Sequence, residues 1–334
     1  MHRTFATLLT LGACTAAPSQ PSATVSVASP GAGPSPRLVV LVVIDQLGTF
    51  HLDRSRDHLR GGFARMLGPD AWHGVGMHPH AKTETCPGHV TLATGAAPAV
   101  HGIPGNRFLV DGEKTYCADL ALMRVESIGD VFSEAGGSVV ALSLKDRAAL
   151  FLAGSTPTLA AWTDKHGVLV HRPVSSGEPV AVAPPLVGAA ETRAWLAEPW
   201  AALDPGAFGT LPAESPYEND HGLGLGFPKR PASEALADAP GTALKYTPAG
   251  GRYLTAAALA AVERHALGAD DTPDLLTVSY SHFDGIGHAH TPASQESVDA
   301  LLRLDQDLGV LMDGLDAAVG ADRWSLVLTG DHGA

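Results

Sequence analysis

Carboxylate and imidazole side chains follow three apolar segments of this sequence. Asp45 comes directly after the run LVVLVVI, and Asp331 and His332 follow SLVLTG. Asp284 and His288 form a D-x-x-x-H pair in the segment DGIGH, which we expect to be a glycine-containing turn. A single aspartate after a strand more often caps a helix or forms a turn. Five such groups at three strand ends predict a metal site, because Zn²⁺ accepts these ligand types at about 2.0–2.2 Å.

A threonine at the start of an expected helix is the candidate nucleophile. Thr85 precedes Cys86 and Pro87, and a proline in the first turn is typical of a helix start. Free backbone N–H groups at such an end would favour an alkoxide and a bound phosphate oxygen. Alternatively, Thr83 or Thr85 serves only as the N-cap of that helix.

Two cationic side chains are candidates for anion binding. Lys145 and Arg147 stand two positions apart, so in an extended segment both side chains would lie on one face and could grip the same anion. The alternative is a solvated, charged turn with the sequence KDR.

These side chains require a scaffold that brings the strand ends together. The runs RLVVLVVID, LLTVSYSHFD and WSLVLTGDHG read as strands buried on both faces, as in a parallel sheet. Helical spacing of apolar residues predicts helices over residues 87–94, 122–135, 253–267 and 294–319. Alternating strands and helices indicate an α/β fold with a mostly parallel central sheet flanked by helices. Ligands bind such sheets at the carboxyl ends of the strands.

The N-terminal part of the chain differs in composition from the rest. Residues 1–14 read as a signal peptide that ends in a lipobox, with Cys14 as the lipidated residue, and residues 15–36 form a tether rich in Pro, Ser, Ala and Gly. The alternative is an ordinary signal peptide cleaved near Ala13 or Ala17. Both readings predict an exported protein, which is either periplasmic or anchored to a membrane as a lipoprotein. No later apolar run reaches the roughly 20 residues that span a bilayer, so contact with a membrane is expected only through a lipid anchor.

The composition limits the class of partner and the number of domains. The chain has 334 residues, 45% of them hydrophobic, and a formal charge of -13, which disfavours nucleic acid and anionic membranes as partners. We expect one catalytic domain over residues 37–334, with a cap inserted at about residues 155–250, where periodicity is weak. Beyond the tether, Cys86 and Cys117 are the remaining cysteines. They form either a disulfide or two separate buried thiols.

Five ordered motifs resemble one known family. They are VVIDQ, TCPGHVTLATG continuing to HGIPGN, SLKDR, FDGIGH and TGDHG. Together they look like the type I phosphodiesterase and nucleotide pyrophosphatase branch of the alkaline phosphatase superfamily, and within it the PafA-type alkaline phosphatases. The resemblance covers about residue 37 to the end and is thin between about 170 and 250. It implies an alkaline phosphatase-like fold and a phosphoric ester hydrolase with two zinc ions.

The resemblance also implies a role for each candidate residue. One zinc would be held by Asp45, Asp331 and His332 together with the oxygen of Thr85. The second would be held by Asp284 and His288, and the phosphoryl oxygens would be bound by Asn106, Lys145 and Arg147. His89 and His101 are expected to pack or hydrogen-bond near the site rather than bind metal.

The second zinc site has one more histidine ligand, far downstream, in that family. It is not in this sequence, so we expect either that the domain is truncated at its C-terminal end or that the protein lacks a complete second site. Zinc should then bind more weakly there, unless His282 or His290 supplies the ligand.

The implied reaction is hydrolysis of small phosphate monoesters. Thr85 would attack phosphorus to give a phosphothreonine, which water then hydrolyses. A phosphodiesterase or nucleotide pyrophosphatase with the same metals is the close alternative, although the positive charge of Lys145 and Arg147 favours a monoester dianion. A non-catalytic relative that keeps the fold is a third reading. A sulfatase is disfavoured, since the segment CPGH lacks the arginine of the sulfatase motif.

Overall fold

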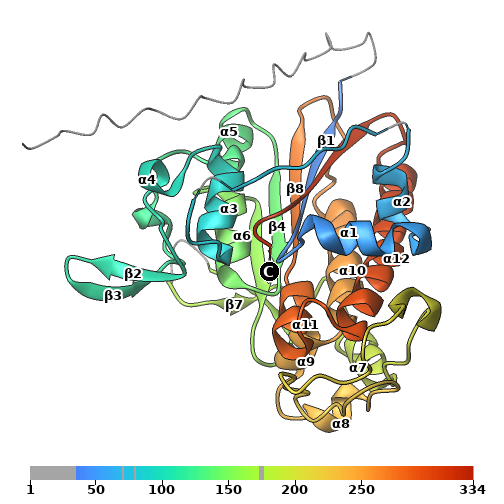
Figure 1. Ribbon diagram of the computed structural model, residues 1–334. Coiled ribbons are helices and arrows are strands. Elements are labelled where there is room, and N and C mark those ends of the chain that lie inside the picture. Colours follow the sequence, from blue (N-terminus) through green and yellow to red (C-terminus); the bar gives the residue numbers. More distant parts are fainter. Residues whose placement is uncertain (1–34, 70, 79, 173–176, 334) are drawn as a thin grey trace, which may run out of the picture. The chain divides into compact units, whose positions relative to one another are not determined.

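A seven-stranded sheet forms the centre of the computed structural model, which describes residues 35–69, 71–78, 80–172 and 177–333. Its strands are β1 Leu38–Ile44, β4 Val139–Ser143, β5 Leu159–Thr163, β6 Leu169–His171, β7 Val180–Ala181, β8 Asp274–Tyr280 and β9 Trp324–Gly330. They lie in the order β7-β6-β5-β4-β8-β1-β9 (Figure 1). Five neighbouring strands, β5, β4, β8, β1 and β9, are parallel to one another, whereas β6 pairs antiparallel with both β5 and β7. The predicted α/β fold with a mostly parallel sheet is confirmed.

Helices cover both faces of this sheet (Figure 1). They are α1 Thr49–Ser55, α2 Gly62–Met66, α3 Thr85–Thr94, α4 Pro98–His101, α5 Ile128–Glu134, α6 Asp146–Ala153, α7 Ala189–Ala197, α8 Ala232–Ala235, α9 Pro240–Tyr246, α10 Ala249–Arg264, α11 His282–His290 and α12 Gln295–Ala318, with short 3-10 turns at Arg56–His58, Leu120–Leu122 and Pro205–Phe208. Alternate residues of β1 face the two layers. Leu41 and Val43 share a buried cluster with residues of α3 and α6, whereas Val40 and Val42 share one with α10 and α12.

The register of β1 brings two carboxylates to the same edge of the sheet. Ile44, the last residue of β1, pairs with Gly330, the last residue of β9. The next residue on each strand is an aspartate, Asp45 and Asp331, and both are fully buried. Because neighbouring parallel strands lie about 4.8 Å apart, these two side chains emerge next to each other at the carboxyl end of the sheet.

The expected helices agree with the structure to different degrees. The segment 294–319 is α12, whose N-cap Ser294 accepts a hydrogen bond from the Ser297 amide. The segment 122–135 was predicted too long, because Ser127 and Asp130 form a capping box that starts α5 at Ile128. Residues 123–126 outside it are not helical.

The segment DGIGH is a helix, and its prediction as a turn was wrong. It lies within α11, directly after β8. Its glycines serve close packing: a Cβ on Gly285 would meet the Lys245 carbonyl oxygen at 2.0 Å, and one on Gly287 would meet the side-chain oxygen of Gln46 at 1.9 Å. Because these two residues have no side chain, α11 can lie close to α9 and to Gln46, in the turn after β1. Asp284 thus stands on a helix and not at a strand end.

The predicted cap over residues 155–250 began too early. Residues 159–181 contribute β5, β6 and β7 to the central sheet. The last two of these strands are only three and two residues long, which explains their weak periodicity. The shorter helices α7, α8 and α9 follow, and a cap formed by the rest of the predicted range, up to about residue 250, stays a prediction. The signal peptide, Cys14 and residues 15–34 of the tether lie outside the described residues, and no described helix is long and apolar enough to cross a membrane.

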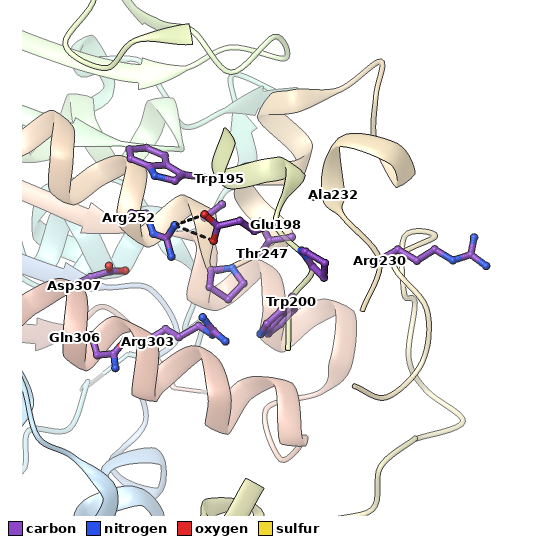
Figure 2. A pocket seen from close by; sticks show the side chains of 13 residues that line it. Trp195, Glu198, Trp200, Arg230, Ala232, Thr247, Arg252, Arg303, Gln306 and Asp307 are labelled. Atoms are coloured by element: carbon purple, nitrogen blue, oxygen red, sulfur yellow. Dashed lines mark hydrogen bonds and ion pairs between the residues drawn. The ribbon is translucent and has the colours of Figure 1, made fainter. Parts of the chain in front are cut away.

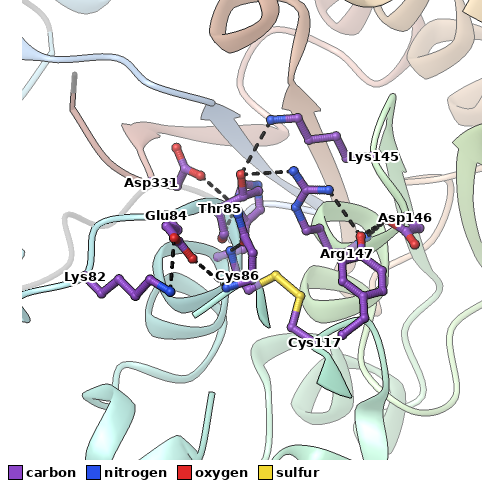
Figure 3. Close-up of a disulfide and its surroundings, with 12 residues drawn as sticks. Lys82, Glu84, Thr85, Cys86, Cys117, Lys145, Asp146, Arg147 and Asp331 are labelled. Atoms are coloured by element: carbon purple, nitrogen blue, oxygen red, sulfur yellow. Dashed lines mark hydrogen bonds and ion pairs between the residues drawn. A yellow bond between two sulfur atoms is a disulfide. The ribbon is translucent and has the colours of Figure 1, made fainter. Parts of the chain in front are cut away.

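Cys86 and Cys117 form a disulfide, which selects one of the two readings left open by the sequence. The bond ties α3 to the segment that follows the hairpin of β2 Arg107–Val110 and β3 Glu113–Tyr116 (Figure 3). Cys86 is the second residue of α3, next to Thr85, so the bond fixes the start of that helix.

Replacing both cysteines with serine is expected to lower the free energy of unfolding by about 3–4 kcal/mol, the chain-entropy value for a closed loop of this size. The loop spans a sequence separation of 31 residues. Urea unfolding with and without a reductant measures the effect. The reductant should destabilise the wild type and leave the double variant unchanged; equal stability of the two proteins would contradict the prediction.

Candidate active site

Asp45, Asp331 and His332 form one buried cluster at the carboxyl ends of β1 and β9. The ligand atoms of the three lie within 4.8 Å of one another. His332 Nε2 lies 3.1 Å from Asp45 Oδ1, while its Nδ1–H donates to the Gly333 carbonyl at 2.8 Å. Asp331 Oδ1 accepts from the backbone amides of Gln46 and His332 at 3.1 and 2.9 Å. These contacts aim Asp331 Oδ2 and His332 Nε2 at Asp45.

The donor set suits a cation. Asp45 Oδ1, Asp331 Oδ2 and Asp284 Oδ1 are buried, and each faces a histidine nitrogen at 2.9–3.2 Å without a well-aligned hydrogen bond. Buried acceptors without a donor carry a desolvation penalty of about 1–3 kcal/mol, more when they are charged. Carboxylate oxygens and an imidazole nitrogen in this arrangement match the ligand preference of Zn²⁺.

Asp284 and His288 lie on α11 beside this cluster. His288 Nε2 is 3.2 Å from Asp284 Oδ1, one helical turn apart, and 70% of the His288 side chain is exposed. Lys145 Nζ bridges Asp284 Oδ2 at 2.5 Å and Asp45 Oδ2 at 2.6 Å. The described residues contain two groups of three side chains that could hold a metal ion, and neither group includes Asp284 or His288. His290 belongs to the second such group and not to this site.

Charges within the cluster oppose the effect of burial. Burial disfavours the Asp45 carboxylate, but Lys145 and His332 outweigh it and hold its pKa well below the usual range. Burial and the neighbouring Asp45 charge raise the pKa of Asp331. Burial alone would lower the pKa of His332, but its contact with Asp45 and the charge of Asp331 raise it to about 9. A metal bound here must displace that proton, so its affinity falls as the pH falls.

Thr85 is the first residue of α3 and is buried beside two cationic groups (Figure 3). Its Oγ1 lies 3.5 Å from Lys145 Nζ and 3.5 Å from a terminal guanidinium nitrogen of Arg147. A phosphoryl group next to Thr85 Oγ1 would meet both side chains. The two predicted cations therefore converge on the predicted nucleophile.

The backbone amides at the start of α3 are mostly engaged, contrary to the expectation of free N–H groups. The Cys86 amide donates to Asn106 Oδ1 at 2.9 Å, and the Gly88 amide donates to the Glu84 carbonyl at 3.0 Å. Pro87 has no N–H. Positive charge near Thr85 comes from side chains instead.

Asn106 lies at this helix start through its own contacts. Its backbone amide donates to Glu84 Oε2 at 2.6 Å, and Glu84 pairs with Lys82 at 3.2 Å. Because its oxygen accepts from the Cys86 amide, its side-chain NH₂ group is the donor available for a ligand.

Lys145 and Arg147 reach Thr85 by a different backbone geometry from the predicted extended segment. Lys145 is extended and is the N-cap residue of α6, whereas Arg147 lies in the first turn of that helix. Arg147 donates to the Tyr116 hydroxyl at 3.2 Å, and that hydroxyl donates to Asp146 at 2.7 Å. Sequence reasoning missed Tyr116 and Asp146 as supports of Arg147, because β3 and α6 are brought together only by the fold.

His89 and His101 are hydrogen-bonded, as expected. His89 Nδ1 lies 2.9 Å from both the Thr85 carbonyl and Asp331 Oδ2, and its Nε2 lies 2.8 Å from Ser279 Oγ. His101 Nδ1 accepts from the Ile103 amide at 3.2 Å. His89 thus connects α3, which begins at Thr85, to the Asp331 carboxylate.

A separate pocket lies between α7, α10 and α12 (Figure 2). Trp195, Arg252 and Arg303 line it, and Arg252 pairs with Glu198 at 3.1 Å. None of the predicted site residues lines this pocket. The chemistry described above is therefore confined to the carboxyl edge of the sheet.

The model of the type I phosphodiesterase / nucleotide pyrophosphatase family matches residues 39–334. The chain belongs to this family. Among type I phosphodiesterase family members, it is 30% identical to alkaline phosphatase PafA of Elizabethkingia meningoseptica over 90% of this chain and 60% of the relative. It is also 30% identical to alkaline phosphatase PhoD of Zymomonas mobilis, over 89% of this chain and 53% of the relative.

Solved structures agree with this family membership. The crystal structure of PafA superposes with a TM-score of 0.78 at 27% identity, covering 90% of this chain and 63% of that one. A PafA variant substituted at one threonine, one asparagine, one lysine and one arginine superposes with a TM-score of 0.79. The chain spans about half to three-fifths of the length of the curated relatives it matches along most of its own length.

Proposed function

We propose that this chain carries the catalytic site of a zinc-dependent phosphate monoester hydrolase, with Thr85 as the nucleophile. The observation that carries the proposal is the position of Thr85 Oγ1, 3.5 Å from two cationic groups and on the helix that His89 links to Asp331. Relatives along most of the chain are named alkaline phosphatases, which supports the reaction class.

Metal binding is assigned to five side chains. Asp45, Asp331 and His332 would hold one Zn²⁺, and Asp284 and His288 would contribute to a second. Zn²⁺ at these positions would supply positive charge that lowers the pKa of the Thr85 hydroxyl and stabilises charge on the phosphoryl oxygens. The unpartnered carboxylate oxygens support a cation in both places.

Two displacements at phosphorus account for the reaction. Thr85 Oγ1 attacks phosphorus, the bond to the alcohol oxygen breaks, and a phosphothreonine forms. Lys145, Arg147 and the NH₂ group of Asn106 hold the non-bridging oxygens. Water then attacks the phosphothreonine, which releases phosphate and restores the Thr85 hydroxyl.

The spacing of the four substituted residues in the PafA variant supports the roles proposed for Thr85, Asn106, Lys145 and Arg147. Its threonine and asparagine are separated by the same number of positions as Thr85 and Asn106, and its lysine and arginine are two apart, like Lys145 and Arg147. We therefore assign Asn106, Lys145 and Arg147 to phosphoryl binding.

A phosphodiesterase or nucleotide pyrophosphatase is the second candidate, and the family description itself favours it. A monoester carries two negative charges on the phosphoryl group and a diester carries one. The two cations next to Thr85 therefore stabilise a bound monoester more than a bound diester.

Replacing Lys145 and Arg147 with alanine tests this preference. Each charge-assisted contact contributes about 1.5–3 kcal/mol, so we expect kcat/KM for an aryl phosphate monoester to fall about ten- to hundredfold per contact, and by less for a diester. Lys114→Ala, on the exposed hairpin strand β3, is the matched control and should change neither activity. Equal losses on both substrates would refute the monoester preference.

We also propose that the protein is exported and anchored through a lipid on Cys14. The short apolar segment and the LGAC sequence in residues 1–14, followed by the tether, support this localisation. The substrates would then be small phosphate esters outside the cytoplasm.

A further inference from the structure

Glu218, His290 and Glu296 form a second buried group of ligand atoms, separate from the site around Thr85. Their carboxylate oxygens and imidazole nitrogen lie within 4.8 Å of one another. His290 is the last residue of α11, Glu296 lies in the first turn of α12, and Glu218 lies in the loop between α7 and α8. Three segments distant in sequence therefore meet at this point.

The ligand atoms of this group lack hydrogen-bond partners. His290 is completely buried, and neither of its ring nitrogens has a hydrogen-bond partner. Glu218 Oε2 likewise has no hydrogen-bond partner, and the side chains of Glu218 and Glu296 are only 2% and 1% exposed. Buried polar atoms in proteins are otherwise nearly always paired, so the unpaired atoms of His290 and Glu218 point to a missing partner.

The spacing of these atoms matches metal ligands better than a hydrogen bond. His290 Nδ1 lies 3.5 Å from Glu218 Oε2, beyond the usual range for N–H···O. Two ligands of a tetrahedral zinc ion with bonds of 2.0–2.2 Å are about 3.3–3.6 Å apart. The observed separation therefore leaves room for an ion that both residues bind.

The charge of the cluster also favours a further cation. Lys229 is buried and lies 2.9 Å from Glu296 Oε1, and its ammonium also donates to the Gly224 carbonyl at 2.8 Å. It neutralises one of the two carboxylates and leaves the other uncompensated. An unpaired buried carboxylate is costly, whereas carboxylates coordinated to a metal are well tolerated.

We propose that Glu218, His290 and Glu296 bind a divalent transition-metal cation, with Zn²⁺ as the expected ion. An imidazole ligand favours zinc over Mg²⁺ or Ca²⁺, which prefer oxygen ligands. The ion would be structural, because all three ligands are buried, and it would fasten the loop to the junction of α11 and α12. The Asn219 amide already binds the Ala289 carbonyl at 2.8 Å in the same place. This proposal does not depend on the catalytic function.

The test is the zinc content of the full chain after Zn²⁺ loading and dialysis. Glu218→Gln and His290→Gln should each lower it by one zinc per chain, or weaken that ion at least about tenfold. His265→Gln is the matched control, because His265 also has a buried ring nitrogen without a partner but lies in neither ligand group of the described residues. Unchanged zinc content in both Glu218→Gln and His290→Gln would overturn the proposal.

A second measurement separates this site from the one near Thr85. In an Asp331→Asn background, Zn²⁺ should still raise the thermal unfolding midpoint, and adding Glu218→Gln should make that rise smaller. Absence of any zinc response in Asp331→Asn, or an equal response in the double variant, would also overturn the proposal. This measurement decides the matter when the single variants fold poorly.

Discussion

Thr85→Ala is expected to lower kcat/KM for an aryl phosphate at least about a thousandfold, because loss of a covalent nucleophile leaves only direct attack by water. The variant should retain its metals, since Asp45, Asp331 and His332 remain. Steady-state kinetics and metal analysis of the same preparation measure both quantities.

Two neighbouring variants make this prediction specific. Thr85→Ser keeps a hydroxyl and should retain part of the activity, while Thr83→Ala, two positions earlier in an exposed segment, should retain nearly all of it. Acid quenching during turnover of a ³²P-labelled substrate should leave label on Thr85. Wild-type activity in Thr85→Ala would reject the assignment and make Thr83 the next candidate.

Asp331→Asn is expected to remove the zinc held by Asp45, Asp331 and His332, one ion per chain, and to lower activity by a comparable factor. Asp331 Oδ2 is a buried carboxylate oxygen that faces the metal cluster, and an amide group there cannot supply the negative charge that a metal needs. The substitution should preserve the fold, because the asparagine oxygen can still accept from the Gln46 and His332 amides that Asp331 Oδ1 binds. Zinc content per chain, circular dichroism and turnover test these three statements.

Asp322→Asn is the matched control for that substitution, since Asp322 is exposed in the turn before β9. It should behave as the wild type in all three measurements. If Asp331→Asn kept its zinc and its activity, the cluster of Asp45, Asp331 and His332 would not be the metal site.

The central strands could be predicted because one requirement, burial on both faces, determines their sequences. β1 and β8 are buried nearly throughout, so every position must be apolar or small, and the runs are visible without knowledge of the fold. Asp45 follows such a run, whereas β9, which precedes Asp331, is partly exposed at the edge of the sheet, so its predicted burial on both faces was wrong. The long helix α12 was found because its buried residues repeat at helical spacing over 24 residues.

The remaining features depend on contacts that no local pattern encodes. Gly285 and Gly287 look like turn formers in the sequence, but the structure uses them to bring α11 close to Lys245 and Gln46. Likewise, Tyr116 supports Arg147 from a hairpin that lies outside the central sheet. Such partners become visible only when the elements are assembled.

The place of β1 between β8 and β9 has a consequence for biosynthesis. Gln46 and its partner Asp331 are separated by 285 positions, which a ribosome covers in roughly 15–60 s at about 5–20 residues per second. For most of that interval, until β8 is made, the nascent β1 has neither of its sheet neighbours, and its backbone edges and apolar side chains are open to other chains. We therefore expect that a chaperone, or a translocation machinery, that holds the early strand until the late ones arrive would raise the yield of folded protein.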